Sequence, residues 1–165
     1  MTTESYSNQT LVDITIGERK ELNAKIVLVD YNLAWPDRYK EIEKIIKEAL
    51  GAQVLLIEHV GSTSVPGLSA KPIIDIILEV QNSADESKYV AVLEEKAFKL
   101  RIREPDWYEH FLLKLPDVNL HVFSANCLET KRMLTFRDWL RNNPDDQMLY
   151  QRKKADLADK IWKYT

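Results

Sequence analysis

The chain has 165 residues, of which 45% are hydrophobic and 30% are charged, a balance typical of a globular domain with a buried core. Because the formal net charge is −3, the molecule as a whole is not expected to attract nucleic acid or an anionic membrane. Local basic patches are compatible with this net charge. Cys127 is the only cysteine, so no intramolecular disulfide can form. With apolar runs too short for a bilayer and a polar start at 1–10, the expected location is cytoplasmic, with no membrane partner.

The first part of the chain is predicted to be an arm followed by a domain. Residues 1–24 are polar and weakly patterned, and we expect an N-terminal arm there with a short strand at 11–16. The domain is predicted to span 25–165, and a short strand or entry segment at 26–29 opens it. Pro36 then suits the first turn of a helix, and apolar residues at helical spacing continue that helix as far as Gly51.

Strands and one further helix are predicted in the middle of the chain. Residues 54–60 and 73–80 have the composition of strands, and the loop 61–71 between them can hold a helical turn. Ser83 and Glu86 have the spacing of a capping box, which predicts a helix from 83 to about 97.

The last third is predicted to form a hairpin and two helices. Strands are expected at 98–103, 110–115 and 120–123, and the turn 116–119 joins the last two. This turn would place Lys114 opposite His121. Helices at about 129–141 and 145–164 follow, separated by Asn142-Asn143-Pro144. The predicted class is α/β (α+β), with one mixed sheet flanked by helices.

The segment from Gly61 to Asp75 carries the most chemical information. Gly61 has no Cβ, so a ligand or another backbone can approach it closely. Hydroxyls follow at Ser62, Thr63 and Ser64, beside backbone N–H groups that suit phosphate oxygens, and Lys71 adds a positive charge. Asp75 lies in an otherwise apolar strand, where a carboxylate is costly unless it is paired or bound to a metal. The alternative is a hydroxyl-rich turn in which Asp75 caps a neighbour.

A longer pattern accompanies this segment. Trp35-Pro36 precedes it, and Leu120-His121-Val122 and a tail of residues 136–140, Pro144, Tyr150 and Lys154 follow it. Together these motifs, over roughly 26–160, resemble the GrpB-like family. The resemblance implies a nucleotidyltransferase-like fold, in which a Gly-Ser after the first core strand positions a triphosphate. It also implies carboxylates on the next strands, two of them one residue apart, that hold a divalent metal.

The chain departs from that superfamily pattern at the metal-binding positions. The strand reads Asp75-Ile76-Ile77, so the second carboxylate is missing. Glu79 shares the face of Asp75 but lies roughly 13 Å along the strand. His121 occupies the expected third position, and an Asp and His pair suits Mn²⁺ or Zn²⁺ better than Mg²⁺. The expected metal ligands are Asp75, His121 and Glu79, although Asp75 and Glu79 are too far apart to bind one ion directly. Asp75 and His121 are also expected to be catalytic. The expected substrate-binding residues are Gly61, Ser62, Thr63, Ser64, Lys71 and Lys114.

Other polar residues have weaker claims. His59 is expected to be a structural histidine, and His110 a surface residue rather than a ligand. Arg137 is interpreted either as a phosphate ligand or as a helix-surface partner of Asp138 or Glu129. The basic run at 152–154 is typical of a solvated helix face.

Two functions fit these observations. The first is a nucleotidyltransferase that acts on a nucleoside triphosphate and an unidentified acceptor with a divalent metal, Mg²⁺ or Mn²⁺. The second is a non-catalytic module of the same fold that binds a nucleotide or phosphorylated small molecule. We expect Gly61, Asp75 and His121 to open into one cleft in either case. The sequence specifies neither the acceptor nor the oligomeric state.

Overall fold

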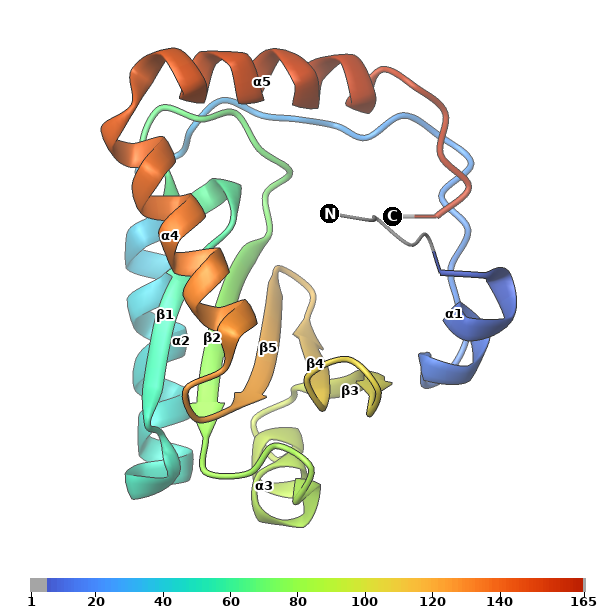
Figure 1. Ribbon diagram of the computed structural model, residues 1–165, viewed down its shortest axis with the longest axis vertical. Coiled ribbons are helices and arrows are strands. Elements are labelled where there is room, and N and C mark those ends of the chain that lie inside the picture. Colours follow the sequence, from blue (N-terminus) through green and yellow to red (C-terminus); the bar gives the residue numbers. More distant parts are fainter. Residues whose placement is uncertain (1–5, 165) are drawn as a thin grey trace.

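The computed structural model describes residues 6–164, in which five strands form one mixed sheet (Figure 1). Their order across the sheet is β1-β2-β5-β4-β3. β2 and β5 are parallel, and every other neighbouring pair is antiparallel. The strands are β1 Leu56–Val60, β2 Ile74–Val80, β3 Lys99–Glu104, β4 His110–Leu115 and β5 Val118–Ser124. The predicted class, a mixed sheet flanked by helices, is confirmed.

Helices cover both faces of this sheet, and α5 runs across one end of it (Figure 1). The predicted pair of C-terminal helices is confirmed, although the second ends at Ala158 rather than near residue 164. Every helix in the described part of the chain is too short or too polar to cross a bilayer. The α-helices are α1 Asn8–Ile14, α2 Trp35–Leu50, α3 Val90–Glu94, α4 Leu128–Asn142 and α5 Pro144–Ala158, and the 3₁₀ turns are η1 Gly51–Gln53, η2 Ser62–Ser64 and η3 Glu86–Lys88.

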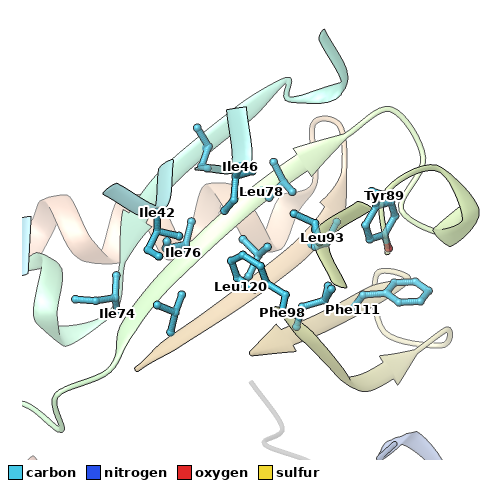
Figure 2. Close-up of a cluster of buried hydrophobic side chains, with 14 of the residues drawn as sticks. Ile42, Ile46, Ile74, Ile76, Leu78, Tyr89, Leu93, Phe98, Phe111 and Leu120 are labelled. Atoms are coloured by element: carbon cyan, nitrogen blue, oxygen red, sulfur yellow. The ribbon is translucent and has the colours of Figure 1, made fainter. Parts of the chain in front are cut away.

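The main core lies between one face of the sheet and α2 with α3 (Figure 2). Ile42 and Ile46 of α2 are almost fully buried because their helical spacing puts both on the face that meets the sheet. Alternate residues of β2 supply the opposing surface, since side chains at every second position of a strand share a face. These β2 residues are Ile74, Ile76 and Leu78.

The opposite face of the sheet is covered only in part. A second, smaller cluster of Val60, Ile77 and Phe123 packs against α4 through Met133 and Leu134. Toward the other end of the same face the residues become polar. Register pairs Asp75 of β2 with Asn119 of β5, and Asn119 with Lys114 of β4, so these three side chains lie side by side. The candidate site is built on this polar end of the sheet.

The N-terminal arm differs from the prediction. Residues 8–14 form α1 instead of a strand, because the Ser7 hydroxyl accepts a hydrogen bond from the Thr10 N–H and caps a helix. Within the predicted strand, Thr15 makes an isolated bridge to Ile102 of β3. The expected strand at 26–29 is likewise reduced to one isolated bridge, between Val29 and Ala70.

The helix predicted from 83 to 97 is also wrong. The Ser83 hydroxyl donates to the Glu109 carbonyl at 2.8 Å and lies 3.0 Å from the Ser124 hydroxyl, so it is not available as a cap. The segment forms η3 and the short α3 instead. Tertiary hydrogen bonds to Ser83 therefore outweigh the local capping pattern.

The β4–β5 hairpin is tighter than predicted. Leu115 pairs with Val118, so the loop is Pro116-Asp117 alone. Lys114 consequently lies opposite Asn119, and Leu112 takes the predicted place opposite His121. Because the register differs by two residues, Lys114 stays on the predicted face of the sheet.

Candidate functional site

A pocket of about 150 Å³ lies at the polar end of the sheet. Five parts of the chain bring charged or polar side chains to it: η2, the loop 65–73 that follows it, β2, the β4–β5 hairpin and α5. Its lining consists of Ser62, Thr63, Ala70, Lys71, Ile73, Asp75, Lys114, Asn119 and Lys154. Five of the residues predicted to form the site, namely Ser62, Thr63, Lys71, Asp75 and Lys114, thus lie around one small cavity. We call it the lysine pocket.

Gly61 lies against Asp75 and leaves room for its carboxylate in this pocket. Its backbone has φ +69°, a conformation that residues with a Cβ rarely adopt. A Cβ built at Gly61 would lie 2.6 Å from Oδ2 of Asp75. The close approach that glycine permits is therefore used by the Asp75 carboxylate, which the β1–β2 register brings next to the end of β1.

The three consecutive hydroxyls have different roles. The Thr63 hydroxyl is buried and donates to the Ile73 carbonyl at 3.0 Å. The Ser64 hydroxyl donates to the Gly61 carbonyl at 2.5 Å. These two bonds hold the turn η2 in shape. Of the three, the Ser62 hydroxyl is the one that faces a cation, since it accepts a hydrogen bond from Nζ of Lys154 at 2.5 Å.

Lysines dominate the charge of the pocket. Burial lowers the pKa of Lys154, although the charge of Asp75 opposes this shift. Burial also lowers the pKa of Lys114, and repulsion from Lys71 and Arg101 adds to that effect. Like charges held this close repel each other, so an anion between them would stabilise the arrangement.

Lys154 is the charged pocket residue that the sequence prediction missed, and Asn119 is an uncharged one. Lys154 belongs to the basic run 152–154, which was interpreted as a solvated helix face, and its neighbour Lys153 is indeed exposed. Lys154 instead points inward, to Ser62 and to the Ser69 carbonyl. The signal that identifies it is its place in the tail pattern of the GrpB-like resemblance.

Asp75 and His121 lie on the same face of the sheet, as predicted. Asn119 donates to Oδ1 of Asp75 at 2.9 Å, and Nε2 of His121 is 3.7 Å from the same oxygen. Both side chains are partly exposed, 29% for Asp75 and 22% for His121. His121 therefore stands at the edge of the lysine pocket, next to its carboxylate.

Glu79 is separate from this pair. Its two carboxylate oxygens accept the backbone N–H groups of Asn126 and Cys127 at 3.1 and 3.2 Å, where they satisfy free donors at the start of α4. The predicted metal set of Asp75, His121 and Glu79 is thus not brought together.

Residues 6–164 contain no group of three His, Cys, Asp or Glu side chains placed to hold a metal ion. A divalent cation would also meet the lysines that line the pocket. The donor set does not fit the superfamily's metal centre.

His59 is buried beneath the site and has a structural role, as predicted. Its ring stacks on Tyr39 with centroids 5.1 Å apart, and Nε2 lies 2.9 Å from the Thr63 hydroxyl. Because Thr63 donates to Ile73, His59 donates to Thr63. Burial lowers the pKa of His59 from its ordinary value of 6.5 to about 4.

This low pKa predicts a pH dependence of stability. Between pH 6.5 and 4, His59 is protonated in the unfolded state but not in the folded state. The free energy of unfolding therefore decreases as the pH falls through that range. In wild type, His59 contributes up to about 1.4 kcal/mol per pH unit to the slope of the free energy of unfolding against pH in this range, and we expect a His59→Gln variant to lack that contribution. Urea unfolding of both proteins at several pH values measures this. Parallel pH profiles for the two proteins would contradict the prediction.

Arg137 also has a structural role. It contacts the Glu58 carboxylate at 2.7 Å, Asp138 at 2.8 Å and the His59 carbonyl at 3.0 Å. The predicted pairing with Asp138 is confirmed, but the Arg137 side chain is only 11% exposed and so does not lie on the helix surface. These contacts tie α4 to β1 behind the lysine pocket.

The interpretation of His110 as a surface residue is wrong. Its side chain is 5% exposed and lies between Glu104 and His121. Beyond these residues is a second cavity of about 640 Å³ beneath α1, with Trp107 and Phe123 in its wall and His121 at its border. Sequence reasoning missed both Glu104 and this cavity, because neither follows a recognisable spacing.

The mixed sheet, with a Gly-Ser turn after its first strand and a carboxylate beside that turn on the next, has the nucleotidyltransferase-like arrangement that the GrpB-like resemblance implies. The family model described as "GrpB protein" matches residues 25–165, and the chain belongs to the GrpB family.

Relatives support this membership. The chain is 52% identical to "UPF0157 protein BH1888" of Halalkalibacterium halodurans, over 95% of this chain and 82% of that protein. The crystal structure of conserved protein GrpB from Enterococcus faecalis is similar, with a TM-score of 0.73 and 31% identity over 80% of this chain and 82% of that one. The chain also matches part of a dephospho-CoA kinase of Mycolicibacterium paratuberculosis with 33% identity. That match covers 87% of this chain and 43% of the kinase.

Proposed function

We propose that this protein binds the phosphate group of a nucleotide or another phosphorylated small molecule in the lysine pocket. The observation that supports this most is the convergence of Lys71, Lys114 and Lys154 on a cavity with one carboxylate, Asp75. These lysines come from distant parts of the chain, so the fold itself assembles the positive charge. Ser62 adds a hydroxyl beside Lys154. Together these groups match the charge and hydrogen-bonding capacity of phosphate oxygens.

The size of the pocket limits what it encloses. A volume of about 150 Å³ suits a phosphate group rather than a whole nucleotide. The organic part of the ligand therefore lies outside the lysine pocket. The larger cavity on the other side of His121 is next to it and has aromatic walls, which favour the flat face of a base.

Metal-dependent nucleotidyl transfer is the competing function, and the superfamily membership favours it. The partial match to a dephospho-CoA kinase also favours chemistry on a nucleotide-like substrate, but that match covers less than half of the enzyme. Against transfer stand the isoleucine at position 77 and the use of Glu79 at the start of α4. We therefore propose binding in preference to transfer.

An assay with nucleotides separates the two functions. The purified protein is incubated with labelled ATP or GTP and with Mg²⁺, Mn²⁺ or no metal, in the presence of candidate acceptors. We expect saturable binding in all three conditions and unchanged nucleotide after long incubation. Turnover that requires a metal would establish transfer instead, and absence of binding to any nucleotide or to inorganic phosphate would contradict both functions.

A further inference from the structure

Behind the lysine pocket, three side chains form a continuous hydrogen-bonded row. Oε2 of Glu104 lies 2.5 Å from Nδ1 of His110, and Nε2 of His110 lies 3.0 Å from Nδ1 of His121. Glu104 and His110 are buried, with side chains 10% and 5% exposed, whereas His121 is 22% exposed. The row thus runs from the interior to the edge of the pocket, where Nε2 of His121 faces Asp75.

The row determines where the protons lie. A carboxylate can only accept, so Nδ1 of His110 carries a proton and donates it to Glu104. Burial lowers the pKa of His110, against an opposing effect of its hydrogen bond to Glu104. With the single ring proton on Nδ1, Nε2 of His110 accepts a hydrogen bond from the ring nitrogen 3.0 Å away. Nδ1 of His121 must then be the donor to His110. In neutral His121 the other ring nitrogen, Nε2, is then unprotonated, and Nε2 is the nitrogen directed toward the pocket.

At the pocket edge two proton acceptors therefore face each other. Nε2 of His121 and Oδ1 of Asp75 are 3.7 Å apart, which is too long for a direct hydrogen bond and leaves both with lone pairs. Acceptors inside a pocket of lysines repel an anion unless the anion brings a proton of its own.

We propose that the lysine pocket selects a phosphate group that still carries a proton, which it donates to Asp75 or to Nε2 of His121. Glu104 and His110 are the positioning residues that keep this nitrogen bare. The ligand class is inorganic hydrogen phosphate or a protonated terminal phosphate monoester. Phosphodiesters and sulfate, which have no such proton near neutral pH, are rejected. This inference depends on the proposed function, because it specifies which anion the same pocket binds.

Competition between phosphate and sulfate tests the selection, since the two ions have similar shape and differ in the proton. We expect calorimetric titration near neutral pH to show phosphate binding at least about tenfold more tightly than sulfate, as for one charge-assisted hydrogen bond. Equal affinities would overturn the selection and leave the proposed function intact. If neither anion bound, the proposed function itself would fail.

Two variants locate the source of the selection. In Asp75→Asn the new amide can donate to sulfate, so we expect the preference to shrink to about twofold or less, mainly through tighter sulfate binding. The matched control is Asp156→Asn, which removes a charge from an exposed residue of α5 outside both the lysine pocket and the larger cavity and should keep the full preference. A preference that survives Asp75→Asn would overturn the role of Asp75.

The ring nitrogens report on the positioning pair without any ligand. At mildly alkaline pH, ¹⁵N NMR of the wild-type protein should show His121 protonated at Nδ1 and bare at Nε2. His110→Phe keeps an aromatic ring against Phe123 but removes the acceptor, so the proton of His121 should shift toward Nε2. A wild-type His121 already protonated at Nε2 would overturn the assignment, whether or not the variant folds.

Discussion

Replacement of Gly61 by alanine is expected to lower the free energy of unfolding by about 2–4 kcal/mol. Two effects add at this position. The backbone has φ +69°, which strains any residue with a Cβ, and the new methyl group would lie 2.6 Å from Oδ2 and 3.0 Å from Cβ of Asp75. Because Asp75 is fixed in β2, it cannot move away without disturbing the β1–β2 ladder. Urea unfolding of wild type and variant measures the loss.

Gly67 provides the matched control for this prediction. It also has positive φ, +84°, but nothing lies within 4 Å of a Cβ built there. Gly67→Ala should therefore show the backbone strain alone, about 1–2 kcal/mol. Combining Gly61→Ala with Asp75→Ala should recover part of the loss, because the carboxylate is removed while the Asp75 Cβ remains. Equal losses at the two glycines, with no recovery in the double variant, would contradict the contact with Asp75.

Lys154→Met is expected to weaken the binding of phosphate or ATP by about tenfold or more. Methionine keeps most of the apolar stem of the side chain and removes the charge that contacts Ser62, so α5 should stay in place. Lys153→Met, next to it on the exposed face of α5, removes the same charge from the protein and should change affinity little. Similar losses in both variants, measured by calorimetric titration, would mean that net charge rather than the pocket drives binding.

The part of the fold that follows from local patterns was predictable from the sequence. The strand 110–115 was predicted with its observed bounds, and α2 ends at Leu50 with Gly51 as its cap, as expected, because apolar periodicity and a glycine stop are local signals. The pair of C-terminal helices follows in the same way from the proline between them. Most of the features that were missed depend on contacts between distant residues, although the Ser7 cap of α1 is a local signal that was missed as well. Ser83 resembles a helix cap, but its hydroxyl is bound to Glu109 and Ser124.

In the candidate site, too, the residues that lie close together in the sequence were predicted, and those that the fold brings together were missed. Gly61, Ser62 and Asp75 were identified because they lie close together in the sequence and carry the GrpB-like resemblance. Lys154 reaches Ser62 across 92 residues, and apart from the tail pattern of the GrpB-like resemblance nothing in the sequence of α5 indicates which of its lysines turns inward. The row from Glu104 to His121 likewise depends on the β3–β4–β5 register, which sequence periodicity fixes only to a face of the sheet.

A crystal structure of the protein with ATP and without added metal would decide whether the lysine pocket binds phosphate. We expect a terminal phosphate in the lysine pocket, within hydrogen-bonding distance of Lys114, Lys154 and the Ser62 hydroxyl. A nucleotide whose phosphates lie elsewhere, with the lysine pocket holding only solvent, would contradict it.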